Sequence, residues 1–470
     1  MRTYIEDVSS SMGKEIIIKA WVDVRRDQGK MVFLDLRDVT GKVQAVVLPN
    51  HTEALEVAQK LRTEWVVEVR GLVNKRPEKN SKKDVVNGDV EIEVLSIVVL
   101  NEATTPAFDI ATDGYEVNEE VRLQKKYLDL RRSRLHHNII MRHKVVKHIR
   151  DMLDVQNFFE IETPLLTNPT PEGSRSYLVP SRIWQGAFYA LPQSPQQYKQ
   201  LLMASGFERY FQIAKCMRDE DTRGDRQPEF TQMDLEMSFV TREDVMKINE
   251  EMLISIVTKL FPEKRIQQVP FPRFTYKEVM EKYNSDKPDI REDKNDPHLL
   301  AFCWVVDFPA FEKTGEDNVD ETGVWTFTHN PFTGVKEEYL QDFLNEKNVG
   351  DIISTQYDVA LNGYEIGGGG IRLHTPELLR KAFTIMGYSD ERIEKNFGHM
   401  LEALGSGIPP HGGIAWGLDR LLMILLNEPN IREVMAFPKT GEGRDLLMQA
   451  PSSAIPKTLR ELGIEVIAKK

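Results

Sequence analysis

Residues 211–239, FQIAKCMRDEDTRGDRQPEFTQMDLEMSF, carry the most informative pattern in this chain. Two runs of alternating polar and apolar residues flank a charged turn. This pattern predicts a β-hairpin, because side chains along a strand point alternately to opposite faces. In an antiparallel hairpin the polar face would hold Gln212, Ala214, Cys216, Arg218, Glu220, Phe230, Gln232, Asp234, Glu236 and Ser238. An arginine beside an aromatic ring among carboxylates suits a nucleotide, with the cation on phosphate and the ring on the base. A solvated surface hairpin is the alternative.

Length and composition indicate an ordinary globular protein of more than one domain. The 470 residues exceed one typical core, and 41% hydrophobic with 29% charged residues fits a soluble chain. No run of about 18 apolar residues and no basic start followed by an apolar run occur, so we expect neither a membrane span nor a secretory signal. The two cysteines, Cys216 and Cys303, are far apart and lack metal-ligand spacing. We therefore expect no disulfide, no zinc and a cytoplasmic location.

The net charge of −12 argues against bulk electrostatic binding of nucleic acid. The charge is unevenly distributed, since residues 1–104 hold 16 Lys and Arg against 17 Asp and Glu. A polyanionic partner is therefore better tolerated at the N-terminal end, or in a local basic pocket elsewhere.

Residues 14–100 contain five β-rich runs separated by turn signals, with a helix-like insert, HTEALEVAQKLR at 51–62, between the third and fourth runs. This order predicts a five-stranded oligonucleotide-binding barrel over residues 1–104. Such barrels bind single-stranded nucleic acid through aromatic and basic side chains. The candidates here include Arg26, Phe33, Gln44, Arg76, Asn80 and Glu93. For Phe33 a place in the core, and for Arg26 a solvated turn, remain open.

The rest of the chain predicts an α+β domain. Residues 105–134 are expected to form a linker or hinge, and residues 135–470 a mainly antiparallel sheet flanked by helices. A helix is predicted where Met141, Val145, Ile149 and Met152 form one apolar stripe. The extended segment NFFEIETPLL at 157–166 follows it and contains Pro164.

Three further segments carry chemistry. In LPQSPQQYKQLLM at 191–203, Gln196 and Lys199 share one face of a helix start. In YDVALNGYEIGGGGIRLH at 357–374, a turn at 362–363 brings Asp358 and Glu365 onto adjacent strands, which indicates a magnesium site. In PPHGGIAWGLDRLL at 409–422, a strand leads into a helix that begins with an arginine, which suits phosphate. Phosphate-loop and dinucleotide fingerprints do not occur.

Together these segments resemble the class II aminoacyl-tRNA synthetases, and more narrowly the bacterial-type aspartyl-tRNA synthetases. The strings at 193–232 and 412–425 are close to those of the family, and YLDLRRS, PEGSRSYLVPSR, YNSDKPDIR and FPKTGEGRDLL add the bacterial features. The resemblance covers nearly the whole chain. There are two departures. The inserted domain usual in bacterial members and expected near 291–301 is missing, because Arg291 and Trp304 are only 13 positions apart. Asn330 follows His329 where a second histidine is usual.

The resemblance implies a fold, a reaction and partners. The fold would be an anticodon-binding barrel plus a class II catalytic domain. The reaction would join L-aspartate to tRNA(Asp) through an aspartyl-adenylate, with ATP as substrate and Mg²⁺ as cofactor. A homodimer is expected, through the segment that ends at Pro164.

The resemblance also assigns roles to residues. Arg218 and Arg420 are the expected catalytic residues. The expected ATP-binding residues are Arg218, Asp219, Glu220, Gln227, Phe230, Glu365, Gly417, Leu418, Asp419 and Arg420. The expected aspartate-binding residues are Glu172, Gln196, Lys199, Arg218, Asp234, His329 and Arg372. Asp358 and Glu365 would hold Mg²⁺, and Arg26, Phe33, Gln44, Arg76, Asn80 and Glu93 would read the anticodon.

Lys199 and Arg372 carry the expected choice of amino acid, because they would meet the side-chain carboxylate of aspartate. Asparagine would leave the two cations partly unpaired, at a cost on the order of several kcal/mol.

Four alternatives remain at this stage. They are a non-discriminating enzyme that also charges tRNA(Asn), an asparaginyl-type enzyme, a non-catalytic RNA-binding paralogue and an amide-forming ligase on the same fold. Lys199 with Arg372 disfavours the second, and the presence of Arg218, Glu365 and Arg420 disfavours the third. The N-terminal barrel disfavours the fourth.

Overall fold

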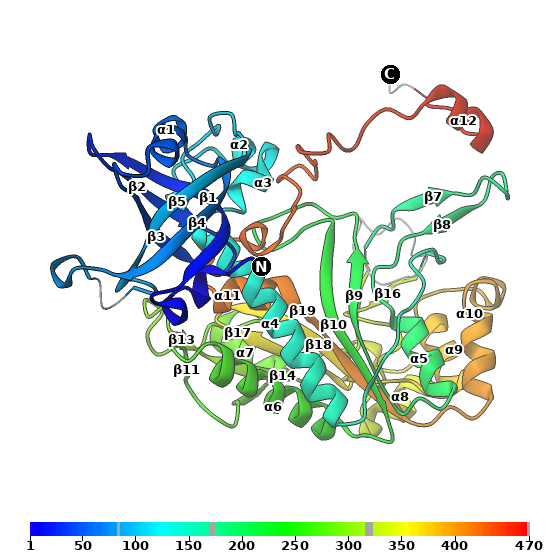
Figure 1. Cartoon of the computed structure of the whole chain (residues 1–470). Coiled ribbons are helices and arrows are strands. Elements are labelled where there is room, and N and C mark those ends of the chain that lie inside the picture. Colours follow the sequence, from blue (N-terminus) through cyan, green and yellow to red (C-terminus); the bar gives the residue numbers. More distant parts are fainter. Residues whose placement is uncertain (82–84, 170–173, 315–322, 468–470) are drawn as a thin grey trace. The chain divides into compact units, whose positions relative to one another are not determined.

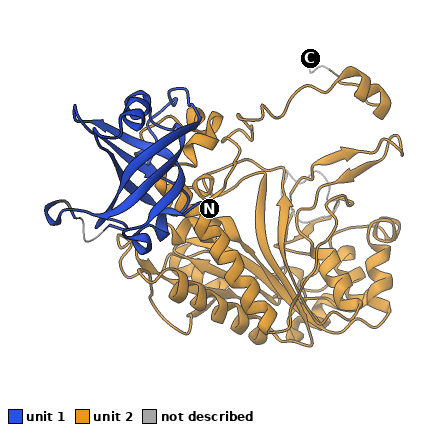
Figure 2. Ribbon diagram, viewed as in Figure 1, with its two compact units in different colours: residues 1–114 blue, residues 115–470 orange. Residues whose placement is uncertain are grey.

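A computed structural model describes residues 1–81, 85–169, 174–314 and 323–467, and Figure 1 shows the whole chain. The chain divides into two compact units, Met1–Gly114 and Tyr115–Lys470 (Figure 2). None of the helices in the described ranges is both long enough and apolar enough to cross a membrane. Both cysteines are buried and free.

The first unit is a closed barrel with strand order β1-β2-β3-β5-β4, as the sequence predicts. Its elements are β1 (Glu15–Asp27), β2 (Val32–Arg37), β3 (Lys42–Val47), α1 (Thr52–Lys60), β4 (Val66–Lys75) and β5 (Val90–Asn101). The helix lies between the third and fourth strands in sequence, also as predicted. Every second residue of β2 is buried in the barrel core, namely Val32, Leu34 and Leu36. Closing the sheet removes this apolar face from water.

The second unit is built on an eight-stranded sheet with the order β12-β14-β17-β18-β19-β10-β9-β6. Only the pairs β12–β14 and β6–β9 in this sheet are parallel, so the predicted mainly antiparallel sheet is confirmed. Its strands are β6 (Phe159–Glu160), β9 (Arg209–Met217), β10 (Glu229–Ser238), β12 (Arg273–Thr275), β14 (Phe302–Val306), β17 (Gln356–Leu361), β18 (Tyr364–Ile371) and β19 (His411–Gly417). Short pairs outside it are β7 (Leu178–Pro180) with β8 (Phe188–Ala190), β11 (Arg265–Ile266) with β13 (Leu299–Leu300), and β15 (Phe311–Lys313) with β16 (Trp325–Phe327).

Helices cover the sheet in two groups (Figure 1). The helices α4 (Ser133–Val155), α6 (Arg242–Leu260) and α11 (Leu418–Leu425) pack on the apolar side of the central strands. The helices α5 (Gln196–Ala204), α9 (Pro376–Ile385) and α10 (Asp390–Gly405) share a second core. The remaining helices are α2 (Glu119–Gln124), α3 (Lys126–Asp129), α7 (Tyr276–Tyr283), α8 (Leu340–Leu344) and α12 (Pro456–Leu462).

Local signals explain several of these elements. Met141, Val145 and Ile149 of the predicted stripe are buried on α4, and Met152 packs partly buried against the same core. The helix α6 begins at a capping box in which Thr241 and Asp244 satisfy each other's backbone N–H groups. Between Arg291 and β14 the chain forms only a loop and β13, so no inserted domain occupies this connection.

Candidate active site

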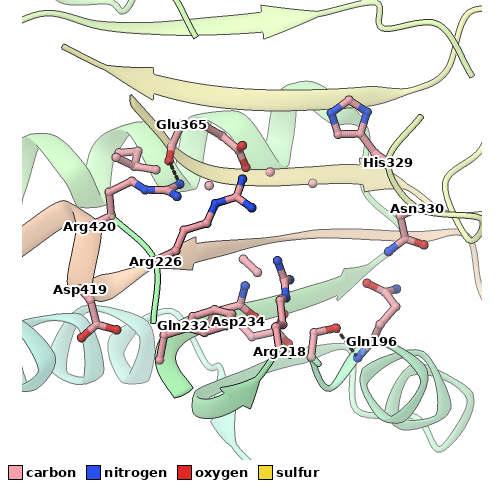
Figure 3. Close-up of a pocket in the computed structure, with 18 of the residues that line it drawn as sticks. Gln196, Arg218, Arg226, Gln232, Asp234, His329, Asn330, Glu365, Asp419 and Arg420 are labelled. Carbon is pink, nitrogen blue, oxygen red and sulfur yellow. Dashed lines mark hydrogen bonds between the residues drawn. The ribbon is translucent and has the colours of Figure 1, made fainter. Parts of the chain in front are cut away.

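A cavity of about 480 Å³ opens on the polar face of the hairpin formed by β9 and β10 (Figure 3). Its walls come from α5, β10, β17, β18, β19 and the start of α11. Most of the predicted ATP- and aspartate-binding residues line it, namely Gln196, Lys199, Arg218, Glu220, Gln227, Phe230, Asp234, His329, Glu365, Arg372, Gly417, Asp419 and Arg420.

Asp219, Leu418 and the predicted metal ligand Asp358 are not among the lining residues. The backbone N–H of Asp219 donates to the carbonyl oxygen of Arg175 at 3.0 Å. Leu418 is fully buried in the core, so its side chain is a packing group. Asp358 is buried beside the lining residue Gln356, whose Nε2 donates to its Oδ1 at 2.6 Å. Glu172 lies outside the described residues.

The hairpin has the predicted register. Phe230 pairs with Cys216, Gln232 with Ala214, and Asp234 with Gln212, so the polar residues of both strands share one face. The other face of β10 carries Met233, Leu235 and Met237, which are fully buried in the main core. The apolar side thus anchors the hairpin, and the polar side is directed into the cavity.

Arg218 is held over the ring of Phe230, with 5.1 Å from the guanidinium carbon to the ring centroid. Its Nε is buried and has no hydrogen-bond partner among the described residues. None of the described carboxylates lies within ion-pair distance of this guanidinium either. A buried, unsatisfied donor on a cation marks a position where an anion is expected.

Four buried charged side chains meet at the opposite end of the hairpin. Lys199 Nζ donates to Asp234 Oδ1 at 2.7 Å and lies 3.1 Å from Glu236 Oε2. Arg372 binds Glu236 with both Nε and a terminal nitrogen, at 2.7 and 3.1 Å. Glu236 is therefore the shared counterion of the two cations predicted to select aspartate. The sequence pattern placed Glu236 on the polar face, but no site prediction included it.

This pairing neutralises the two cations that were expected to meet the side-chain carboxylate of aspartate. Each already has a carboxylate partner, and the four charges sum to zero. Burial acts to raise the pKa of Glu236, but the charges of Arg372 and Lys199 and the hydrogen bond from Arg372 outweigh it and hold the pKa at about 2. For Asp234 burial outweighs Lys199, so its pKa lies above the ordinary value. Asp234 Oδ2 is buried and has no described hydrogen-bond donor.

Gln227 is fixed in one orientation by its neighbour. The backbone N–H of Lys439 donates to Gln227 Oε1 at 2.8 Å, and a backbone N–H can only donate. The other end of the Gln227 amide is therefore its nitrogen, which is buried without an acceptor among the described residues. Gln227 thus presents a hydrogen-bond donor to the cavity.

Asp358 and Glu365 lie on the neighbouring antiparallel strands β17 and β18, joined by the predicted turn at Asn362 and Gly363. A β-bulge brings both carboxylates to one face. Ala360 pairs with Glu365 and Val359 with Gly367, so Ile366 is an extra residue on β18. Without it Glu365 would point away from the face that Asp358 shares with Gly368.

The two carboxylates and their surroundings fit a divalent cation. Burial first, and then the charge of Asp358, raises the pKa of Glu365. This like-charge repulsion is what a metal ion relieves, and oxygen ligands suit Mg²⁺. No cluster of three or more His, Cys, Asp or Glu side chains with metal-site geometry occurs in the part of the chain that the structure describes. The protein would thus supply two ligands, and substrate oxygens or water the others.

His329 and Asn330 also line the cavity (Figure 3). His329 Nε2 lies 3.6 Å from Asp358 Oδ2. Burial favours the neutral ring, but Asp358 outweighs it and raises the pKa of His329. Asn330 Oδ1 accepts a hydrogen bond from the backbone N–H of Phe332 at 2.9 Å, so its side chain stabilises the local turn.

Gly417 ends β19, and α11 begins at Leu418, as predicted. Arg420 donates to the carbonyl oxygen of Glu365 and to Asp225 Oδ2, the latter at 3.1 Å, and its Nε is buried without a partner among the described residues. Asp419 accepts from the backbone N–H of Thr231 at 2.8 Å and from Arg142. Asp419 thus ties β10 to α11 and α4, while Arg420 keeps a donor for a ligand.

Further lining residues were missed by the sequence-based site prediction: Asp221, Asp225, Arg226, Gln232, Thr328 and Gln356. Arg226 pairs with Glu220 at 2.9 Å, which engages one of the carboxylates expected to bind ATP. The charged turn of the hairpin was the available signal for Arg226 and Asp225, but its conformation is irregular. For Gln356 the available signal was its position two residues before Asp358, which puts both side chains on one face of β17.

The barrel carries a row of predicted anticodon residues on its outer face. Arg26 pairs in register with Phe33, Phe33 with Val46, and Val46 with Glu93, across four strands. Phe33 is half-buried and lies outside the core, and Gln44 is paired with Asp35 on the same face. Arg76 differs, because its side chain is buried. Asn80 ends a short 3-10 helix, and its side chain lies outside the part of the chain that the structure describes.

Arg26 and Glu93 each pair with neighbouring side chains on this face. Arg26 forms a two-pronged ion pair with Asp35 at 2.7 and 2.8 Å. Glu93 accepts from Asn74 at 3.0 Å and lies 3.1 Å from His51. The barrel face therefore offers an aromatic ring flanked by polar groups, a composition that suits unstacked bases.

Comparisons with known proteins agree with both parts of this description. Residues 118–441 match the family model described as tRNA synthetases class II (D, K and N), and residues 16–100 match an OB-fold nucleic acid binding domain. An aspartate–tRNA(Asp/Asn) ligase of Rubrobacter xylanophilus is 39% identical, over an alignment that covers 97% of this chain and 95% of the relative. An aspartate–tRNA ligase of Staphylococcus saprophyticus is 38% identical, and 99% of each chain is covered.

A solved structure shows the same fold. Asparaginyl-tRNA synthetase from Pyrococcus horikoshii, complexed with asparaginyl-adenylate, superposes with a TM-score of 0.74 at 22% identity, covering 94% of this chain and 98% of that one. The match of the family model covers well over half of this chain, and the full-length relatives extend it. The chain therefore belongs to the class II tRNA synthetases, in the family of the aspartate, lysine and asparagine enzymes.

Proposed function

We propose that this protein ligates L-aspartate to tRNA(Asp) in two steps, with aspartyl-adenylate as the intermediate. The carrying observation is that Lys199 and Arg372 lie buried in the same cavity as Arg218 and Phe230. One cavity thus offers a cationic end for an acidic amino acid and a cation–ring pair for a nucleotide. The two bacterial relatives, both named as aspartate–tRNA ligases, support this assignment.

In the first step the α-carboxylate of aspartate attacks the α-phosphorus of ATP, and pyrophosphate leaves. Arg218 would neutralise charge at the α-phosphate and hold the attacking carboxylate. Phe230 would stack on adenine, and the Gln227 amide nitrogen would donate to the nucleotide. Arg420 would bind the terminal phosphate through its remaining donor. Such a displacement is accelerated by positioning and charge neutralisation, so no side-chain nucleophile is required.

The balance of charge would favour aspartate over asparagine. Lys199, Arg372, Asp234 and Glu236 together are neutral, and Arg218 adds one positive charge that no described carboxylate compensates. Aspartate carries one net negative charge and asparagine none, so the cations at this end of the cavity would bind aspartate more tightly than asparagine. Arg372 and Lys199 would turn toward the side-chain carboxylate while keeping Glu236, and Asp234 and Gln196 would receive the α-ammonium group.

In the second step the aspartyl group would pass to the terminal ribose of the tRNA, at the 3′-hydroxyl if the class pattern holds. The outer row of the barrel, which runs from Arg26 through Phe33 to Glu93, would read the anticodon by stacking and edge contacts. The name of the Rubrobacter xylanophilus relative includes both tRNA(Asp) and tRNA(Asn). A range that includes tRNA(Asn) is therefore the second candidate function.

Asp358 and Glu365 would hold Mg²⁺ with the phosphates of ATP. When bound, the metal ion supplies neutralisation of phosphate charge. A homodimer is part of the proposal, and exposed Phe159, Leu165 and Leu166 around the sheet-edge strand β6 are apolar groups that a partner would cover. A cytoplasmic location accompanies the proposed tRNA substrate.

The proposal is tested by ATP–pyrophosphate exchange with aspartate and, separately, asparagine. We expect exchange with aspartate to exceed exchange with asparagine by on the order of 100-fold or more in kcat/KM. No exchange with aspartate would overturn the proposal. Aminoacylation of purified tRNA(Asp) and tRNA(Asn) in parallel then separates a discriminating enzyme from one that accepts both.

A further inference from the structure

A chain of buried hydrogen bonds leads from the cavity along α5 to the start of β19. Gln196 Nε2 donates to Gln200 Oε1 at 3.1 Å, and Gln200 Nε2 lies 3.1 Å from His411 Nε2. His411 Nδ1 lies 2.8 Å from the carbonyl oxygen of Pro409. Gln196, Gln200 and His411 are each at most 4% exposed. Of these residues, Gln196 alone lines the cavity, where Figure 3 shows its side chain extending from α5.

The direction of every hydrogen bond in this chain follows from its last member. A proline carbonyl can only accept, so His411 Nδ1 must carry a proton and donate. Burial keeps the imidazole neutral by lowering its pKa, and its Nε2 is then an acceptor. Gln200 must therefore direct its amide nitrogen toward His411 and its oxygen toward Gln196.

The same logic orients Gln196. Its amide nitrogen donates to Gln200 Oε1, so its oxygen is the atom left to accept a hydrogen bond from a ligand in the cavity. No described residue donates a side-chain hydrogen bond to this oxygen. A free glutamine presents either end of its amide, whereas this one presents an acceptor. An acceptor suits an ammonium group and repels a second acceptor.

We propose that Gln200 and His411 are positioning residues that hold the Gln196 amide oxygen toward the cavity, where it accepts a hydrogen bond from the α-ammonium group of the amino-acid substrate. This inference rests on the proposed function, because it presumes that aspartate binds beside Gln196. Neither Gln200 nor His411 lines the cavity, so both act only through Gln196.

The test uses Gln200→Met in the full-length enzyme, because methionine has a similar length and no hydrogen-bonding amide. We expect KM for aspartate to rise on the order of tenfold while KM for ATP stays within about twofold, since one charge-assisted hydrogen bond is weakened. Gln197→Met is the matched control, on the same helix and bonded to His399 outside the cavity. It should leave both KM values unchanged.

Succinate separates positioning from general damage, because it resembles aspartate without the α-ammonium group. As a competitive inhibitor it should show the same Ki in Gln200→Met as in the wild type. In a Gln196→Glu background both side-chain oxygens are acceptors, so adding Gln200→Met should change KM for aspartate little. His411→Phe breaks the chain at its other end and serves if Gln200→Met fails to fold.

Two results would overturn the inference: an unchanged KM for aspartate in Gln200→Met, or an equal loss for aspartate, ATP and succinate. The wild-type arm reports on the proposed function separately. Absence of aspartate-dependent exchange in the wild type contradicts the proposed function. Normal wild-type exchange with an unaffected Gln200→Met variant contradicts only the positioning role.

Discussion

Among single residues, Glu236 sets the charge at the amino-acid end of the cavity. It is fully buried, binds Arg372 with both carboxylate oxygens and lies within ion-pair distance of Lys199. Gly413 on β19 makes room for it, since a Cβ there would lie 2.2 Å from Glu236 Oε2. The alternating pattern of β10 was enough to predict the face on which Glu236 lies. Its partner could not be predicted, because Arg372 is 136 positions away in the chain.

Replacing Glu236 by glutamine should destabilise the protein and make aspartate a stronger stabiliser. Removing one member of a buried ion pair costs about 3–5 kcal/mol, because the cations remain buried. The side-chain carboxylate of bound aspartate would restore part of the lost negative charge. We therefore expect a lower Tm for Glu236→Gln and a larger rise in Tm on adding aspartate than in the wild type.

Thermal unfolding with and without saturating aspartate measures both effects. Glu250→Gln is the matched control, because Glu250 is also an internal acceptor, for the Phe271 backbone and the Trp304 indole, but does not line the cavity. Its aspartate-induced shift should equal that of the wild type. An equal shift in Glu236→Gln would refute the role of Glu236 as counterion.

Among the elements, the hairpin of β17 and β18 brings the two candidate metal ligands together. Its turn was predictable, because Asn-Gly favours positive φ, and Asn362 and Gly363 have φ of 51° and 87°. The bulge at Ile366 was not predictable, since an extra unpaired residue does not alter the pattern of an apolar and glycine-rich strand. Gly368 completes the arrangement, because a Cβ at this position would lie 2.7 Å from Asp358 Oδ1.

Gly368→Ala should displace the Asp358 carboxylate and weaken the response to Mg²⁺. A shift of about 1 Å in a positioning group costs on the order of 100-fold in rate, and part of it should be recovered at high Mg²⁺. Exchange rates over a MgCl₂ titration test this. Gly405→Ala is the control, because its Cβ would make an ordinary 3.6 Å contact with Pro376. An unchanged Mg²⁺ dependence in Gly368→Ala would argue against Asp358 as a ligand.

Across the larger unit, a buried ionic network joins the start of the catalytic domain to its end. Arg122 of α2 and Arg134 of α4 both bind Glu433, at 2.8 Å each, and Glu433 follows α11. These partners are about 300 positions apart, so local periodicity carries no information about them. The helix α4 was predicted from its apolar stripe, whereas α2 lies in the stretch expected to be a linker, and this network was not predicted. The division of the chain at Gly114 is likewise a property of long-range contacts.

The network predicts a pH-dependent contribution to stability. Burial disfavours the charged form of Glu433, but hydrogen bonds and charges from Arg122 and Arg134 outweigh it and lower its pKa to about 2. A lowered folded-state pKa stabilises the protein above the unfolded pKa of 4.5, and this stabilisation is lost as the pH falls toward 2. The free energy of unfolding of the wild type should exceed that of Glu433→Gln by about 3 kcal/mol near neutral pH.

Urea unfolding of both proteins from pH 7 down to the acid limit of folding measures this difference. It should be constant above about pH 5 and shrink below it. Glu391→Gln on the exposed surface of α10 should show no such trend. A difference that stays constant down to the acid limit would contradict the role of the Glu433 charge.

The direction of the hydrogen bonds in the chain that ends at Pro409 would reverse with the protonation of His411. If His411 takes a proton, its Nε2 becomes a donor, and Gln200 must turn its oxygen toward the ring. Gln200 would then donate to Gln196, and Gln196 would present its nitrogen to the substrate. Glu236 favours this protonation, whereas burial, Arg372 and His374 oppose it. One proton, bound outside the cavity, would thus convert an ammonium receptor into one that repels ammonium.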